Sequence, residues 1–143
     1  MKETFYERIG EAVCRERLTN GLEVCVVPKP GYAKKYAFFS TRYGGMDTRF
    51  CLDGQWLNTP AGIAHYLEHK LFENEDCDAF ERYARTGASA NAYTSFERTA
   101  YLFNCTGRLE ESLEILLDFV QRPYFTEETV IISGGGKTSS HTV

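Results

Sequence analysis

Alternating apolar positions divide the first half of the chain into short strands. Two such runs, 13–18 and 22–27, flank Asn20-Gly21, a dipeptide that favours the type I′ turn of a β-hairpin. The aromatic-rich stretch 36–43 predicts another strand, and 90–95 and 99–106 predict two strands joined by a tight turn. Residues 46–59 carry scattered Asp, Asn, Gly and Thr, so we expect a loop there.

Helical periodicity appears in the second half of the chain. Residues 60–72 predict a helix, with Thr59 as N-cap and Pro60 at the first helical position. Residues 78–86 predict a second helix that Gly87 ends, and 109–120 predict an amphipathic third one. Thr126-Glu127-Glu128 resembles the first turn of a fourth. Strands in succession with segregated helices predict an α+β fold, a mostly antiparallel sheet with helices packed on one face.

The character of the chain changes after residue 130. The last residues include SGGGKTSSHTV, which is small, polar and without periodicity. We therefore expect a partial peptidase-like domain over 1–130, on the grounds given below, and a disordered tail over 131–143.

Composition excludes several classes of function. With 43% hydrophobic residues, 14% aromatics and a net charge of −4, the 143-residue chain predicts a globular domain and argues against a non-specific nucleic-acid binder. No apolar run approaches the roughly 20 residues of a membrane-spanning helix, and the charged start shows no secretory signal. Five cysteines without CxxC spacing favour reduced thiols and a cytoplasmic location; a disulfide framework or cysteine-type zinc site is the lesser alternative.

The strongest chemical signal is His65-Tyr66-Leu67-Glu68-His69, an HxxEH pattern. On a helix, His65 and His69 are one turn apart and face the same way, so both imidazoles can reach one Zn²⁺. Glu68 then flanks the metal without binding it, which suits a general base that takes a proton from the attacking water. Ile63, Leu67 and Leu71 form the stripe expected to face the core.

The pattern is rare but incomplete. Only about 0.006 chance matches are expected in a chain with so few histidines, although two surface histidines beside a carboxylate would look the same. A zinc site also needs a third protein ligand. Glu73, one turn past His69, could approach a metal, but a solvated carboxylate at the helix end is the better interpretation.

Three separated stretches, GIAHYLEHKLFE, GASANAYTSFERTAYLF and LLDFVQRPYFTEETV, resemble the pitrilysin/insulinase family of zinc metallopeptidases. The resemblance runs from about residue 18 to 130 and corresponds to the opening part of a family member. It implies an α+β fold, Zn²⁺ as cofactor, His65 and His69 as ligands and Glu68 as catalytic base.

The same resemblance suggests a place for the substrate. It implies that Asn91, in the stretch Asn91-Ala92-Tyr93-Thr94, lies near the substrate, and that its strand pairs with an extended peptide. From the residues alone, Asn91 is as well explained by a bond to its own backbone. The expected partners are peptide or unfolded-protein substrates and a homologous peptidase subunit, with no nucleic acid and no membrane.

The chain departs from the family where the third ligand should be. The resemblance places a glutamate on the helix that follows, about seventy residues beyond the second histidine, yet no Glu or Asp occurs after Glu128. His141 could replace it only by ordering a glycine-rich tail. We therefore expect a peptidase chain truncated or frameshifted before its third ligand and inactive alone; the alternative is a non-catalytic peptidase-like subunit that binds a partner or peptide.

Overall fold

The computed structural model describes residues 1–75 and 77–126. These residues form two compact units, the first over Met1–Ala33 and the second from Lys34 onward. The helix start expected at Thr126 and the tail expected over 131–143 lie outside the described residues, apart from Thr126 itself.

The first unit is a three-stranded antiparallel sheet in the order β1-β2-β3. Its strands are β1 (Lys2–Tyr6), β2 (Glu11–Arg17) and β3 (Glu23–Val26). The predicted hairpin around Asn20-Gly21 is confirmed as β2 and β3. Gly21 adopts a φ of 87°, and the Asn20 side chain accepts a hydrogen bond from the Leu22 N–H at 3.0 Å. The strand β1 was not predicted.

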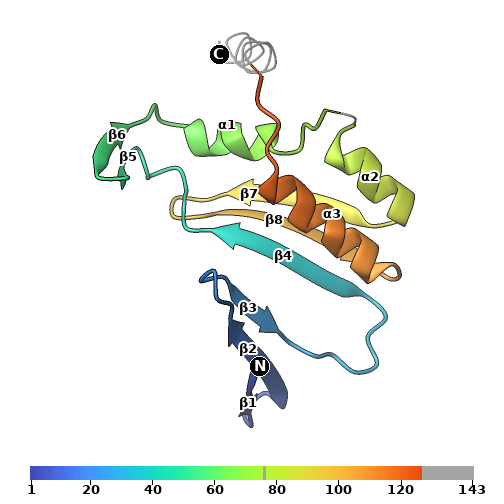
Figure 1. The fold of residues 1–143 in the computed structure, drawn as a ribbon. Coiled ribbons are helices and arrows are strands. Elements are labelled where there is room, and N and C mark those ends of the chain that lie inside the picture. The colour runs from blue at the N-terminus through green and yellow to red at the C-terminus, as the bar shows by residue number, and fades with distance from the viewer. Residues whose placement is uncertain (76, 127–143) are drawn as a thin grey trace, which may run out of the picture. The chain divides into compact units, whose positions relative to one another are not determined.

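The second unit contains one three-stranded antiparallel sheet and three helices. The strands β4 (Lys35–Thr41), β8 (Thr99–Cys105) and β7 (Ser89–Thr94) lie in the order β4-β8-β7. The helices are α1 (Ile63–Lys70), α2 (Ala79–Thr86) and α3 (Leu109–Gln121). All three pack on one face of the sheet (Figure 1). The expected α+β architecture with helices on one face is confirmed.

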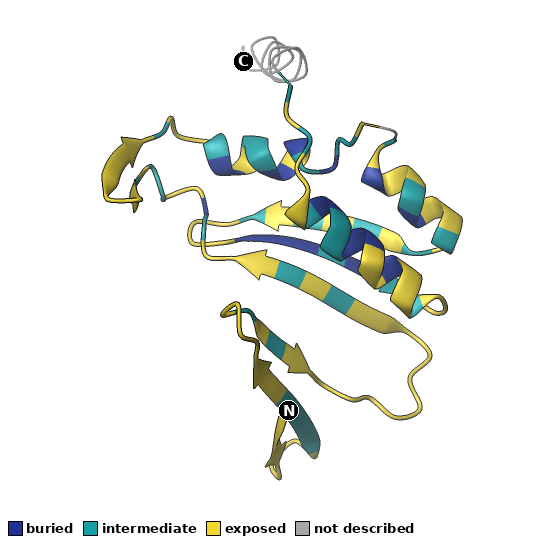
Figure 2. Ribbon diagram, viewed as in Figure 1, coloured by how far each residue is buried: buried dark blue, intermediate teal, exposed yellow. Residues whose placement is uncertain are grey.

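The core lies between the helices and the central strand β8. Five of the seven β8 residues are buried, and buried positions also line the sides of the helices that face the sheet (Figure 2). An aromatic cluster fills this space: Phe72 stacks on Phe119 at a centroid distance of 5.1 Å and on Phe80 at 4.3 Å, and Tyr101 lies 5.8 Å from Phe72. The cluster joins the segment after α1 to both other helices and to β8.

Residues 46–59 are not the predicted loop. They form a second hairpin, β5 (Arg49–Leu52) and β6 (Gln55–Asn58), around Asp53-Gly54, whose φ values are 50° and 79°. Two consecutive positive φ angles are what a type I′ turn needs, and Asp-Gly is among its favoured dipeptides. The sequence signal was present; the scattered polar residues of two exposed strands hid it.

The start of α1 was also placed wrongly. Thr59 does not cap the helix, because it lies four residues before Ile63 and its hydroxyl donates to the Thr48 carbonyl. Its N–H bonds to the same carbonyl at 2.8 Å and closes the base of the β5–β6 hairpin. Gly62, with a φ of 88°, is the N-cap residue, so α1 begins at Ile63. The second predicted helix was placed correctly: Asp78 accepts a hydrogen bond from the Phe80 N–H at 2.7 Å, and Gly87 ends α2 with a φ of 75°.

None of the described helices has the length and apolar character needed to cross a bilayer. All five cysteines lie among the described residues and are free thiols.

The structure predicts an unusual response to Tyr83→Phe. The Tyr83 hydroxyl is buried and finds no hydrogen-bond partner among the described residues, so its removal leaves the free energy of unfolding at pH 7 unchanged or raises it by up to about 1 kcal/mol. Burial raises the pKa of this phenol well above its ordinary value near 10. The unfolded chain therefore ionises first as pH rises, and stability falls above about pH 10.

Urea unfolding of the wild type and Tyr83→Phe at pH 7 and about pH 10.5 checks this. The higher pH lies just above the ordinary phenol pKa of about 10. The variant is expected to lose less stability between the two conditions. A clear loss in the variant at pH 7 would mean that the hydroxyl has a partner.

Candidate metal centre

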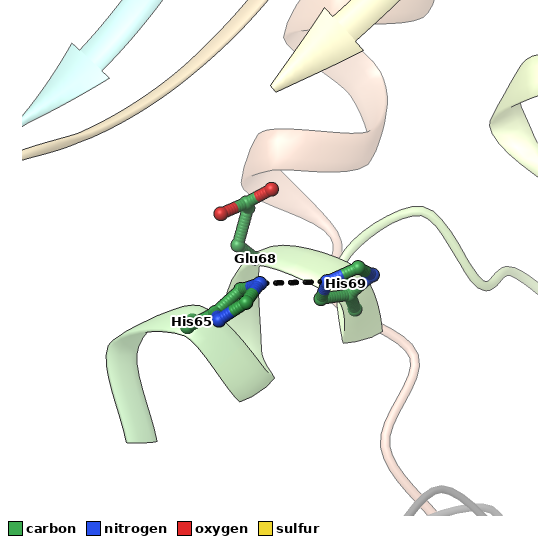
Figure 3. A group of neighbouring side chains, drawn as sticks. All are labelled: His65, Glu68 and His69. Atoms are coloured by element: carbon green, nitrogen blue, oxygen red, sulfur yellow. Dashed lines mark hydrogen bonds between the residues drawn. The ribbon is translucent and has the colours of Figure 1, made fainter. Parts of the chain in front are cut away.

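The two histidines of the HxxEH pattern converge on one side of α1. Because four residues make about one turn, His65 and His69 stack along the same face, with ring centroids 4.7 Å apart. Their Nε2 atoms face each other at 2.9 Å, and both side chains are exposed. Figure 3 shows the two rings side by side, joined by this contact. The predicted pairing of the imidazoles is thus present in the fold.

Glu68 leaves the helix in a different direction (Figure 3). Its side chain is turned toward the sheet and only 8% of the residue surface is exposed. The Thr94 hydroxyl, at the end of β7, donates a hydrogen bond to Glu68 Oε2. A carboxylate oxygen of Glu68 and one nitrogen of each histidine all lie within 4.8 Å of one another. Glu68 therefore borders the histidine pair while being held from the sheet side.

The neighbouring Tyr101 shows where the Glu68 carboxylate lies relative to the sheet. Tyr101 is buried on β8, and its pKa is raised above its ordinary value, first by burial and then by the negative charge of Glu68. The Glu68 carboxylate thus lies close to the helix-facing side of both β7 and β8. Packing of α1 against these two strands places it there.

The inward face of α1 is not the one expected. Ile63, Leu67 and Leu71 are only half-buried, whereas Ala64, Glu68 and Lys70 are buried. The hydrophobic stripe was a poor guide because polar side chains can also be buried when a partner is within reach. Here Thr94 serves Glu68, and Glu73 serves Lys70.

The donor set fits a transition metal such as zinc. Tetrahedral zinc with Zn–N distances of about 2.0–2.1 Å sets two nitrogens about 3.3 Å apart, close to the separation of the Nε2 atoms. The two imidazoles are suitable zinc ligands, and a carboxylate is a common neighbour of a zinc ion. A stable site still requires at least one more protein donor, and no further His, Cys, Asp or Glu joins this cluster in the described residues.

Glu73 is not positioned as that donor. Its carboxylate forms an ion pair with the Lys70 ammonium, whose side chain is completely buried. A buried cation needs its counter-ion, so the ion pair engages the Glu73 carboxylate, whose side chain is 41% exposed. His141, the other alternative considered from the sequence, lies outside the described residues.

Asn91 does not join the cluster. It is exposed on β7, and its Oδ1 accepts a hydrogen bond from the adjacent Ala92 N–H at 2.8 Å. Side chains alternate along a strand, so Asn91 faces the side of the sheet opposite to Thr94 and the helices. The structure matches the plain interpretation of a bond to its own backbone, and a role in substrate binding stays a prediction.

Sequence reasoning missed Thr94 and Lys70. Thr94 is the last residue of the stretch that contains Asn91, and strand alternation from Asn91 would have placed it on the opposite face. Nothing in the local sequence shows that this face meets α1, because the contact spans 26 residues. Lys70 was hidden by its type, since lysine is almost never fully buried without a partner.

Comparisons with known proteins identify the family. The profile of the insulinase family (peptidase family M16) matches residues 57–132, more than half of the chain. The chain belongs to this family. The resemblance drawn from the three sequence stretches is therefore confirmed.

Two close relatives and one more distant structure place the chain within the family. It is 53% identical over 132 residues to the uncharacterized zinc protease YmfH of Bacillus subtilis, covering 91% of this chain and 31% of that one. An M16-like peptidase from Alicyclobacillus acidocaldarius has a TM-score of 0.84 at 46% identity, over 87% of this chain and 30% of that one. Pitrilysin shares the fold, with a TM-score of 0.70 at 21% identity, over 91% and 14%.

The chain spans about a third of the length of the nearest of these relatives. The activity and partners of a whole family member are therefore matters for proposal.

The buried ion pair on α1 predicts a compensating double variant. Glu73→Gln leaves the Lys70 ammonium buried without an anion, which we expect to cost about 1–2 kcal/mol, less than for a fully buried pair because Glu73 is partly solvated. Lys70→Met combined with Glu73→Gln is expected to recover most of this loss, because no charge is then buried. Urea unfolding of the three proteins measures it; a double variant less stable than Glu73→Gln would contradict the prediction.

Proposed function

We propose that the chain carries part of the active site of a zinc-dependent metallopeptidase that acts on peptides or unfolded protein. The facing Nε2 atoms of His65 and His69, 2.9 Å apart on one side of α1, carry this proposal. Membership of the M16 family and the zinc-protease name of the relative YmfH support it. His65 and His69 would hold the metal, and Glu68 would be the catalytic base.

The chemistry divides between the metal and the chain. When bound, zinc supplies a Lewis acid that polarises the scissile carbonyl and makes water more acidic. The chain's own contribution is the Glu68 carboxylate, which is buried and fixed at Oε2 by Thr94. Its other oxygen, Oε1, is left to accept the proton of the attacking water and to pass it to the leaving amine.

The strand next to α1 offers a place for the substrate backbone. Within the described residues β7 lies at the edge of its sheet, paired with β8 alone. An edge strand presents unpaired N–H and C=O groups, to which an extended peptide can add as a further strand. Because α1 packs on β7, such a peptide would run close to the histidine pair. We propose that Asn91, which lies on this strand, is near the bound substrate.

The third ligand is expected from outside the described residues. The glutamate that the family resemblance places in this role is missing, because the sequence has no Glu after Glu128. We therefore propose that the chain alone is catalytically inactive. A homologous subunit is the partner that we propose to complete the site. A cytoplasmic location stays an expectation from the sequence.

Zinc content tests the site itself. Purified chain kept in equilibrium with added zinc is expected to hold about one zinc, bound weakly because only two imidazoles converge on the position, whereas His65→Ala and His69→Ala are expected to hold none. Glu68→Gln should retain the metal, because the carboxylate is a base and not a ligand. Native mass spectrometry with zinc present gives the stoichiometry.

The third histidine provides the matched control. His141→Ala changes the same residue type outside the HxxEH pattern and should leave the zinc content unchanged. Loss of zinc in this variant would instead identify His141 as the missing ligand. A wild-type chain that retains no zinc would reject the site as a metal centre.

Peptide hydrolysis tests the proposed inactivity. With a quenched fluorescent peptide mixture and added zinc, the isolated chain is expected to show no zinc-dependent turnover. Turnover that falls by about 10²-fold or more in Glu68→Gln would contradict this, because it would show a complete site with Glu68 as its base.

The exposed edge of β7 also allows a test of the alternative function, a non-catalytic subunit that binds a partner or peptide. Peptide binding at this edge needs no metal, so a chain that retains no zinc yet binds an extended peptide would favour the non-catalytic, peptide-binding subunit. Fluorescence anisotropy with a labelled unfolded peptide, measured in the presence of a chelator, makes this distinction.

A further inference from the structure

We propose that Thr94 is the positioning residue of Glu68: its hydroxyl holds one carboxylate oxygen against the sheet and thereby directs the other toward the histidine pair. This inference rests on the proposed function for the role of Glu68, but the contact itself is independent of any metal. It adds a second structural element, the β7–β8 hairpin, to a site otherwise built from one helix.

The Glu68 carboxylate depends on Thr94 for a partner. It is 8% exposed, and the Thr94 hydroxyl is its hydrogen-bond donor among the described residues. A buried carboxylate without a donor is costly, and one with a single donor has its orientation set by that donor. The direction of the Glu68 side chain therefore follows the position of the Thr94 oxygen.

Thr94 is itself held in place. It lies opposite Thr99 in the β7–β8 register, and the turn beyond it is closed by the Ser95 N–H on the Arg98 carbonyl at 2.8 Å. The Gly45 N–H bonds to the Ser95 carbonyl at 2.9 Å and ties the same turn to the segment after β4. Threonine also has restricted χ1 freedom, which keeps its hydroxyl in one direction.

The neighbouring Thr99 determines which hydroxyl proton is available to Glu68. Thr99 is buried, and its Oγ1 donates to the Tyr43 carbonyl at 2.9 Å while lying 3.4 Å from Thr94 Oγ1. A hydroxyl has one proton to donate. With the Thr99 proton directed to Tyr43, the Thr94 proton is available for Glu68.

The backbone beside this support is closely packed. An added Cβ at Gly44 would come within 2.5 Å of the Phe96 carbonyl oxygen and the Arg98 nitrogen. The segment after β4 and the β7–β8 turn are thus in direct backbone contact, and Tyr43, which anchors Thr99, precedes this contact. The support of Glu68 is thus tied by backbone contacts to the segment after β4.

Two matched variants separate the hydroxyl from the shape of the side chain. Thr94→Val keeps the β-branched shape and removes the donor, whereas Thr94→Ser keeps the donor. Infrared spectra of metal-free chain labelled with ¹³C-carboxyl glutamate are recorded for each, and the band lost in Glu68→Gln identifies Glu68. We expect this band to shift in Thr94→Val and to stay in place in Thr94→Ser. An unshifted band in Thr94→Val, or a shifted one in Thr94→Ser, overturns the proposal.

A second measurement tests whether the effect runs through Glu68. Thr94→Val is expected to weaken zinc binding by about threefold, because the Glu68 charge beside the histidines, although not a ligand, is no longer held in place. The Kd is expected to stay unchanged in the Glu68→Gln background. An equal change in both backgrounds would show a merely structural role and overturn the proposal. Far-UV circular dichroism confirms that each variant is folded; if Thr94→Val is not, Thr94→Ala, which also removes the donor, takes its place in both measurements.

The two proposals fail in different ways. If no variant binds zinc, the metal site of the proposed function is rejected, while the infrared comparison in the metal-free chain still decides the role of Thr94.

Discussion

The second unit depends on one packing interaction, the contact of Phe72 with three other elements. Phe72 lies two residues beyond the end of α1, and its ring meets Phe80 at the start of α2, Tyr101 on β8 and Phe119 on α3. Aromatic rings bury a large area and prefer defined offsets, so this contact fixes position as well as adding stability. The histidine pair is carried by an eight-residue helix, too short to be stable alone. Its end is held by this cluster.

The same anchoring explains why a short helix can hold two polar side chains inward. The C-terminal end of α1 is fixed by Phe72, Ala64 is buried, and the helix packs against β7 and β8. Glu68 and Lys70 are therefore buried whatever their own preference, and each is stabilised by a specific partner. Under the proposed function, activity and stability place opposite demands on position 68, because an apolar residue there would bury more easily but could not move a proton.

Local signals in the sequence were sufficient for elements that their own residues define. The β2–β3 hairpin, α2 with its Asp78 cap, and the amphipathic α3 were all placed within one or two residues. The convergence of His65 and His69 followed equally from helical geometry. What could not be predicted depends on contacts distant in sequence. Thr59 was assigned to the helix because its bond to Thr48 was not visible, and Thr94 was overlooked because its partner is on another element.

The β5–β6 hairpin has a consequence for how such chains can vary. Its base is closed by Thr59 on the Thr48 carbonyl, and within the described residues its strands pair mainly with each other. Residues between Thr48 and Thr59 can therefore be inserted or deleted without moving Gly62, the N-cap of α1, because a longer loop costs little additional free energy. The hairpin is a segment in which relatives can diverge in length and surface while the spacing of the histidines stays constant.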